Sequence, residues 1–114
     1  MVVSQGDIHW AELGAPVGSG PGFNRPVIVV QGDALNRTTI ATVVCVPLTS
    51  TVHHSTALGN VLLQARRTGL FRDSVANVSQ ILTIDRSQLG DRVGRLSDRE
   101  LDQLFAGIDI VLGR

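Results

Sequence analysis

The segment Gly22-Phe23-Asn24-Arg25-Pro26-Val27-Ile28-Val29-Val30-Gln31 decides how this chain folds. Its continuous apolar run, Val27 to Val30, is β-branched throughout, which is typical of a buried strand. Pro26 has no backbone N–H, so it suits only the first residue of a strand or an edge. Arg25 therefore lies where a Gly-rich loop, residues 14–22, meets the predicted sheet. A guanidinium held there can clamp a phosphate through two N–H groups, although a surface salt bridge is the plainer interpretation.

Short apolar or alternating runs on both sides of this segment predict further strands. We expect strands over residues 7–13, 25–31, 41–50, 60–64, 74–78, 81–84 and 92–96, with turns or single helical turns at 34–38, 67–69 and 87–89. Short strands separated by Gly-rich turns are typical of a small barrel or a strongly curved sheet.

A helix should close the chain. Ser97-Asp98-Arg99-Glu100 has the pattern of a capping box, in which the serine and the glutamate satisfy each other's backbone N–H groups. Apolar residues then recur at helical spacing and predict one face that packs on the sheet: Leu101, Leu104, Phe105, Ile108, Val111 and Leu112. Ile110 falls off this stripe, so we expect it to be exposed or to meet a second subunit.

Composition agrees with one domain spanning residues 1–114, of which 43% are hydrophobic. The sequence has no apolar run of about 18 residues, which predicts no membrane span, and its first residues do not have the pattern of a signal peptide. Cys45 is the sole cysteine and lies in an apolar run. It is predicted to be an inert core thiol, and the protein to be cytoplasmic.

The charge balance argues mildly against a nucleic-acid partner, because formal net charge is zero and non-specific nucleic-acid binders carry a basic excess. All ten basic side chains are arginine, which is also what a GC-rich genome produces. A neutral protein can still present a basic groove if its acids lie elsewhere. Several arginines fall in predicted loops, and many acids fall in the last third of the chain.

Taken in order, these blocks resemble the MazF/PemK family of bacterial toxins. The resemblance covers the whole chain and rests on Gly6-Asp7-Ile8-His9-Trp10, the Gly-rich loop, Arg25-Pro26-Val27, Asp33-Ala34-Leu35-Asn36, Thr49-Ser50, Phe71-Arg72-Asp73-Ser74-Val75, Gln80 to Asp85, and Leu89 to Gly94. It implies a mainly β fold with helices (α+β), an SH3-like small barrel of the MazF/PemK/CcdB type with a C-terminal helix, forming a single toxin domain over residues 1–114.

The resemblance also implies a function. It is that of a sequence-specific, metal-independent endoribonuclease, the toxin of a type II toxin–antitoxin system, which cleaves single-stranded RNA such as mRNA. Attack by the 2′-hydroxyl would give a 2′,3′-cyclic phosphate, with no cofactor and no metal. The resemblance further implies a homodimer that holds RNA in an interface groove, and a cognate antitoxin protein whose acidic tail occupies that groove.

The resemblance carries a catalytic role onto Arg25 and Thr49. The match to the family also allows the catalytic hydroxyl to lie one residue away from Thr49, because two further hydroxyl residues follow it. The plainer role of the Thr49 hydroxyl is to cap a backbone group. The general base is left unassigned. RNA contacts are implied for Ser19, Asn24, Ser50, Thr51, His53 and Gln80.

His53 and His54 are the rival candidates for acid–base chemistry. Adjacent residues on an extended chain point in opposite directions, so we expect a solvated loop, or one histidine contacting RNA. His9, on the first predicted strand, is expected to be partly exposed. No set of histidines and acids has metal-ligand spacing. Aromatic residues make up only 4% of the chain, so hydrogen bonds from loops, and not base stacking, should dominate recognition.

Two other function classes stay open. A CcdB-like toxin of the same fold would bind DNA gyrase without cutting RNA, but the Arg-Pro and Thr-Ser features favour the nuclease. A plain SH3-like interaction module is disfavoured, because the sequence offers no aromatic peptide groove.

Overall fold

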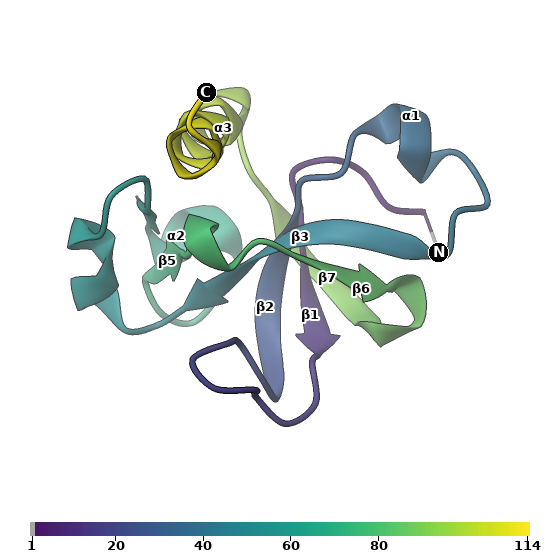
Figure 1. Ribbon diagram of the computed structural model, residues 1–114, viewed down its shortest axis with the longest axis horizontal. Coiled ribbons are helices and arrows are strands. Elements are labelled where there is room, and N and C mark those ends of the chain that lie inside the picture. The colour runs from purple at the N-terminus through teal and green to yellow at the C-terminus, as the bar shows by residue number, and fades with distance from the viewer. Residues whose placement is uncertain (1) are drawn as a thin grey trace.

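A computed structural model gives the structure of residues 2–114, in which seven strands form one curled antiparallel sheet (Figure 1). The elements are, in order, β1 (Asp7–Glu12), β2 (Asn24–Val29), α1 (Asp33–Asn36), β3 (Thr42–Thr49), η1 (Val52–Thr56), β4 (Val61–Leu63), α2 (Ala65–Thr68), β5 (Ser74–Ala76), η2 (Val78–Gln80), β6 (Leu82–Asp85), η3 (Arg86–Gln88), β7 (Leu89–Arg95) and α3 (Asp98–Leu112). The η elements are short 3-10 helices. Within these residues, no helix has the length and apolar character needed to cross a membrane.

Strand β3 organises the sheet, whose main path runs β4-β5-β3-β2-β1-β7. One edge of β3 pairs with β2, with Val27 opposite Pro47. Its other edge pairs first with β6 and then, at its end, with β5. The end of β3 therefore lies beside the beginning of β2, so the sheet topology brings Thr49 close to Arg25.

All seven predicted strands are present, with shifted bounds. The strand predicted over 74–78 ends at Ala76, because residue 78 begins the tight turn of η2. The last strand starts earlier than predicted, at Leu89. The polar loop expected after Thr49 is instead the 3-10 helix η1. The predicted turn at 67–69 is the end of the short helix α2, with Gly69 as its C-cap.

The continuous apolar run of β2 is explained by apolar clusters on both faces of the sheet. Ile28 packs in the cluster that α3 covers through Leu104. Val27 and Val29 pack in the opposite cluster with Cys45. Burial raises the pKa of the Cys45 thiol to about 12, which agrees with the prediction of an inert core cysteine.

Helix α3 begins at the predicted capping box. The Glu100 N–H donates to Ser97 Oγ over 3.2 Å, and the Ser97 N–H donates to Glu100 Oε1 over 2.8 Å. The prediction that the apolar stripe is buried along its whole length is wrong at its end, since Val111 is 38% and Leu112 is 61% exposed. Helix α3 contacts η2 and β4, and its buried residues, Leu104, Gly107 and Ile108, lie in its middle, so its last turn extends past them.

The middle of α3 touches the segment before β4 through two glycines. A Cβ atom built on Gly107 would collide with the carbonyl oxygen of Gly59, and one on Gly59 would lie 2.9 Å from the carbonyl oxygen of Gly107. Gly59 also has a positive φ of 86°, which side chains other than glycine rarely adopt. This backbone contact therefore sets how closely the helix approaches the sheet.

Candidate active site

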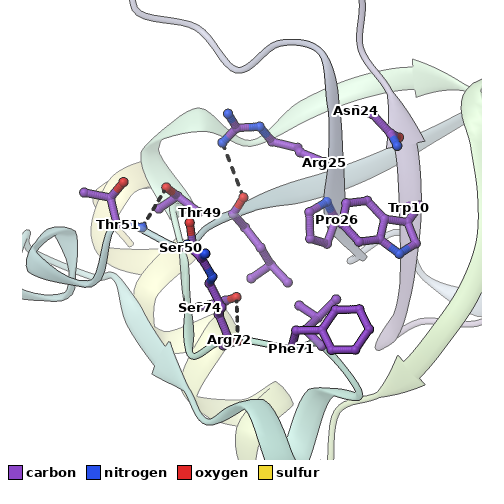
Figure 2. Close-up of a pocket in the computed structure, with 12 residues that line it drawn as sticks. Trp10, Asn24, Arg25, Pro26, Thr49, Ser50, Thr51, Phe71, Arg72 and Ser74 are labelled. Carbon is purple, nitrogen blue, oxygen red and sulfur yellow. Dashed lines mark hydrogen bonds between the residues drawn. The ribbon is translucent and has the colours of Figure 1, made fainter.

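A pocket of about 480 Å³ opens where β1, β2 and the end of β3 meet the segment that leads into β5 (Figure 2). The residues that line it are Trp10, Asn24, Arg25, Pro26, Leu48, Thr49, Ser50, Thr51, Leu70, Phe71, Arg72 and Ser74. The pocket brings together side chains that are far apart in the sequence, from Trp10 to Ser74. It includes both residues predicted to be catalytic, Arg25 and Thr49.

Arg25 is half-buried on β2, with its guanidinium directed across the end of β3. Its Nε donates to the carbonyl oxygen of Gly22, and its Nη1 donates to that of Leu48, each over 3.3 Å. Within residues 2–114 it forms no salt bridge, so the plainer interpretation of a surface ion pair is wrong. Its remaining N–H groups are available to a ligand in the pocket.

Thr49 is the last residue of β3 and also lines the pocket. The register of β2 and β3, continued two residues beyond the pair of Val27 with Pro47, places Thr49 opposite Arg25. The Thr51 N–H donates to Thr49 Oγ1 over 3.2 Å, so the hydroxyl does cap a backbone group. Because that bond uses only its acceptor side, its own O–H can still donate to a ligand.

Three of the residues with predicted RNA contacts, Asn24, Ser50 and Thr51, line the same pocket. Ser19, His53 and Gln80 do not. Gln80 Nε2 donates to the carbonyl oxygen of Ser19 over 2.6 Å, which ties the Gly-rich loop to η2.

The expectation that His53 and His54 point in opposite directions is wrong. His53 and His54 lie in η1 and not on an extended chain, and their ring centroids are 4.4 Å apart with 38° between the ring planes. A 3-10 helix turns by about a third of a circle per residue, so neighbouring side chains need not point apart. The structure therefore brings both rings to one place, on the helix that follows Thr51.

His9 was expected to be partly exposed, and this is also wrong, since it is only 2% exposed. Its Nδ1 lies 3.0 Å from the carbonyl oxygen of Gly90, and its Nε2 lies 3.9 Å from Asp7 Oδ2. Strand β7, which carries Gly90, pairs with β1 along its edge, with Arg92 opposite His9. His9 is thus buried in the fold, away from the pocket.

The other seven pocket residues had no predicted site role: Trp10, Pro26, Leu48, Leu70, Phe71, Arg72 and Ser74. The Phe71-Arg72-Asp73-Ser74-Val75 motif was a signal, but nothing in it shows that this segment faces Arg25. Half of the chain's four aromatic side chains line the pocket. The described residues 2–114 contain no group of three or more His, Cys, Asp or Glu side chains arranged to hold a metal ion.

Comparison with known proteins gives a consistent set of relatives. The family model described as "PemK-like, MazF-like toxin of type II toxin-antitoxin system" matches residues 4–112. The chain is 42% identical over 112 residues to endoribonuclease MazF6 of Mycobacterium tuberculosis, which covers 98% of each chain. It is 36% identical to endoribonuclease EndoA of Bacillus subtilis, over 98% of this chain and 96% of the relative.

Solved structures show the same fold. The M. tuberculosis toxin MazF-mt6 superposes with a TM-score of 0.78 at 25% identity, over 94% of this chain and 96% of the other. MazF from Deinococcus radiodurans superposes with a TM-score of 0.83 at 21% identity, over 100% and 99% of the two chains. A mycobacterial endoribonuclease in complex with its cognate antitoxin gives 0.74 at 24% identity, over 98% and 94%. The predicted mainly β fold with a C-terminal helix is confirmed.

Proposed function

Because this chain belongs to the PemK-like, MazF-like family of toxins of type II toxin–antitoxin systems, we propose that it is an endoribonuclease that cuts single-stranded RNA at the Arg25 pocket. The relatives described above carry the name endoribonuclease and match nearly the full length of the chain. A CcdB-like toxin that binds DNA gyrase is not favoured, since neither the family model nor these relatives are of that kind.

The observation that carries the proposal is the state of the Arg25 guanidinium. It is held in place by two backbone carbonyl oxygens, those of Gly22 and Leu48, and has no carboxylate partner among residues 2–114. A preorganised cation without a counter-charge, facing a pocket, is suited to stabilise negative charge that develops on a phosphoryl group.

The reaction that fits this arrangement uses the RNA's own 2′-hydroxyl. The 2′-oxygen loses its proton and bonds to the adjacent phosphorus, the bond from phosphorus to the 5′-oxygen breaks, and that oxygen takes up a proton. The products are a 2′,3′-cyclic phosphate and a 5′-hydroxyl. Arg25 stabilises the charge on the non-bridging oxygens, and the Thr49 O–H donates a second hydrogen bond to the reacting phosphate.

Two protein partners belong to this proposal. The first is a cognate antitoxin whose acidic segment fills the Arg25 pocket, so that antitoxin and RNA compete for one guanidinium. The second is another copy of the chain. The last turn of α3 leaves apolar side chains in water, with Ile110 48% and Leu112 61% exposed, and burial of this surface in a homodimer would remove it from solvent.

The test is to incubate the purified protein with a long single-stranded RNA in EDTA and to map the new ends. We expect cuts at a short recurring sequence, with 5′-hydroxyl and cyclic phosphate termini. An RNA with a 2′-O-methyl or 2′-deoxy sugar at the cut position should resist. Loss of cutting in EDTA, or cutting of the modified RNA, would refute the mechanism. An intact RNA together with inhibition of gyrase would instead support the CcdB-like alternative.

A further inference from the structure

Phe71 is a large aromatic side chain that lies entirely in solvent, with a relative exposure of 103%. It is also one of the residues that line the Arg25 pocket. An exposed aromatic ring gains free energy when a partner covers it, because its apolar surface leaves water. Its location at the pocket suggests that the covering group is a ligand of the pocket.

The segment that carries Phe71 is anchored on both sides. The Leu70 N–H donates to the Thr68 hydroxyl over 3.1 Å, and Thr68 is fully buried. Beyond the ring, Asp73 Oδ1 accepts the Ala65 N–H over 2.8 Å. The ring is therefore displayed on a short, tied segment, which reduces the entropy that ligand binding would otherwise cost.

Two other flat side chains, Trp10 and Pro26, line the pocket with Phe71. They are directly opposite each other in the register of β1 and β2. In Figure 2 the Trp10, Pro26 and Phe71 rings gather on one side, whereas the Arg25 guanidinium and the Thr49 and Ser50 hydroxyls lie on the other. The pocket thus combines a flat apolar side, which suits a base, with a polar side, which suits a phosphate. Together the two sides match one nucleotide.

We propose that Phe71 is a stacking platform for a nucleobase next to the phosphate held by Arg25, and that it contributes to the choice of cleavage site. This inference rests on the proposed function and adds a binding residue to it. Base stacking on aromatic rings contributes to single-strand binding with any sequence, and differences in stacking strength between bases add a modest preference. RNA is favoured over an acidic peptide as the occupant because the flat apolar rings and the guanidinium lie side by side in one pocket, as the base and the phosphate of a nucleotide require.

The experiment compares Phe71→Ala and Phe71→Trp with the parent protein. The ligand is a short RNA that spans a mapped cut site and carries a 2′-O-methyl group at the cut position, so that binding is measured without cleavage. Phe71→Ala should weaken this binding roughly 5- to 150-fold, the range for loss of one aromatic–base stack, and Phe71→Trp should retain it. The matched control is Leu35→Ala, which removes a half-exposed apolar side chain on α1, outside the pocket.

A second arm identifies the stacked base. An RNA with an abasic nucleotide at each position around the cut, in turn, should lose affinity for the parent at one position. At that position the abasic change should cost the Phe71→Ala protein little more, because both changes remove the same contact. Independent effects at every position, or an unchanged affinity of Phe71→Ala, would overturn the inference.

The outcome separates this inference from the proposed function. If the parent binds this RNA through Phe71 but the Arg25→Ala protein cuts unmodified RNA as fast as the parent, only the proposed function of the Arg25 pocket fails. If the parent cuts RNA and Phe71→Ala binds and cuts equally well, only the stacking role fails. If Phe71→Ala weakens an antitoxin peptide but not RNA, the ring is a peptide platform and the inference is wrong.

Discussion

Replacement of Arg25 by alanine should remove most activity while leaving the fold intact. The guanidinium forms two hydrogen bonds, to the carbonyl oxygens of Gly22 and Leu48, and both are long at 3.3 Å. Because the side chain is only half-buried, water can replace it at these carbonyls. We expect the free energy of unfolding to fall by about 1 kcal/mol, a change of about 4 °C in the melting temperature of a domain of this size.

The effect on catalysis should be much larger. Removal of one preorganised donor to a developing oxyanion commonly lowers the rate by about 100- to 1,000-fold. Arg25→Lys should recover little of this loss, since an ammonium group presents a point charge and not a planar fork of N–H groups. The two measurements therefore separate a role in the reaction from a role in the fold.

The assay is single-turnover cleavage of a fluorescent RNA at saturating protein, with urea unfolding of the same samples. Arg37→Ala is the charge-matched control, because Arg37 is exposed beside α1 and lies outside the pocket. It should cleave like the parent. A folded Arg25→Ala protein that cuts RNA at nearly the parent rate would falsify the assignment, and loss of folding together with activity would make Arg25 a structural residue.

Three further outcomes are expected. The His53→Ala/His54→Ala double variant should keep most of its single-turnover rate, because neither ring lines the pocket; a loss as deep as that of Arg25→Ala would make them the acid–base pair. Gly107→Ala should lower the free energy of unfolding by about 1–3 kcal/mol, since its methyl group collides with backbone, whereas Gly32→Ala, with open space around it, should be nearly neutral in the same urea titration. A backbone N–H holds the pKa of Asp33 below its ordinary value, so its carboxylate stabilises the fold above pH 4 and stabilises it less as the pH falls through the lowered pKa. The Asp33→Asn protein should therefore be less stable than the parent at pH 7 but approach the stability of the parent at pH 3. An equal difference at both pH values would contradict this.

The strands and the capped helix could be predicted because their signals are local. The β-branched run at Val27 to Val30 needs both faces covered, and the serine and glutamate at the start of α3 satisfy each other within one turn. The pairing of Arg25 with Thr49 in one site came from family resemblance. The sheet register supplies a physical reason for it, which no local pattern contains.

Two of the differences concern contacts between distant segments, and one concerns a local turn. His9 was expected to be partly exposed because the sequence of β1 does not show that its ring contacts the carbonyl oxygen of Gly90. The side-by-side rings of His53 and His54 depend on a 3-10 turn, which the polar sequence of this segment does not predict. In the sequence, Phe71 is a single apolar residue in a short motif. Only the folded chain places it in the same pocket as Arg25.

The pairing of β1 with β7 has a consequence for the synthesis of the protein. Asp7 pairs with Arg95, so a strand near the beginning of the chain is completed by one near its end. Contacts between residues so far apart in sequence form slowly, because a long loop must first close. Since β1 also supplies Trp10 to the pocket, a nascent chain that has not yet made β7 lacks a stable wall for its site. Activity at this pocket should therefore begin only after β7 has been translated and has paired with β1.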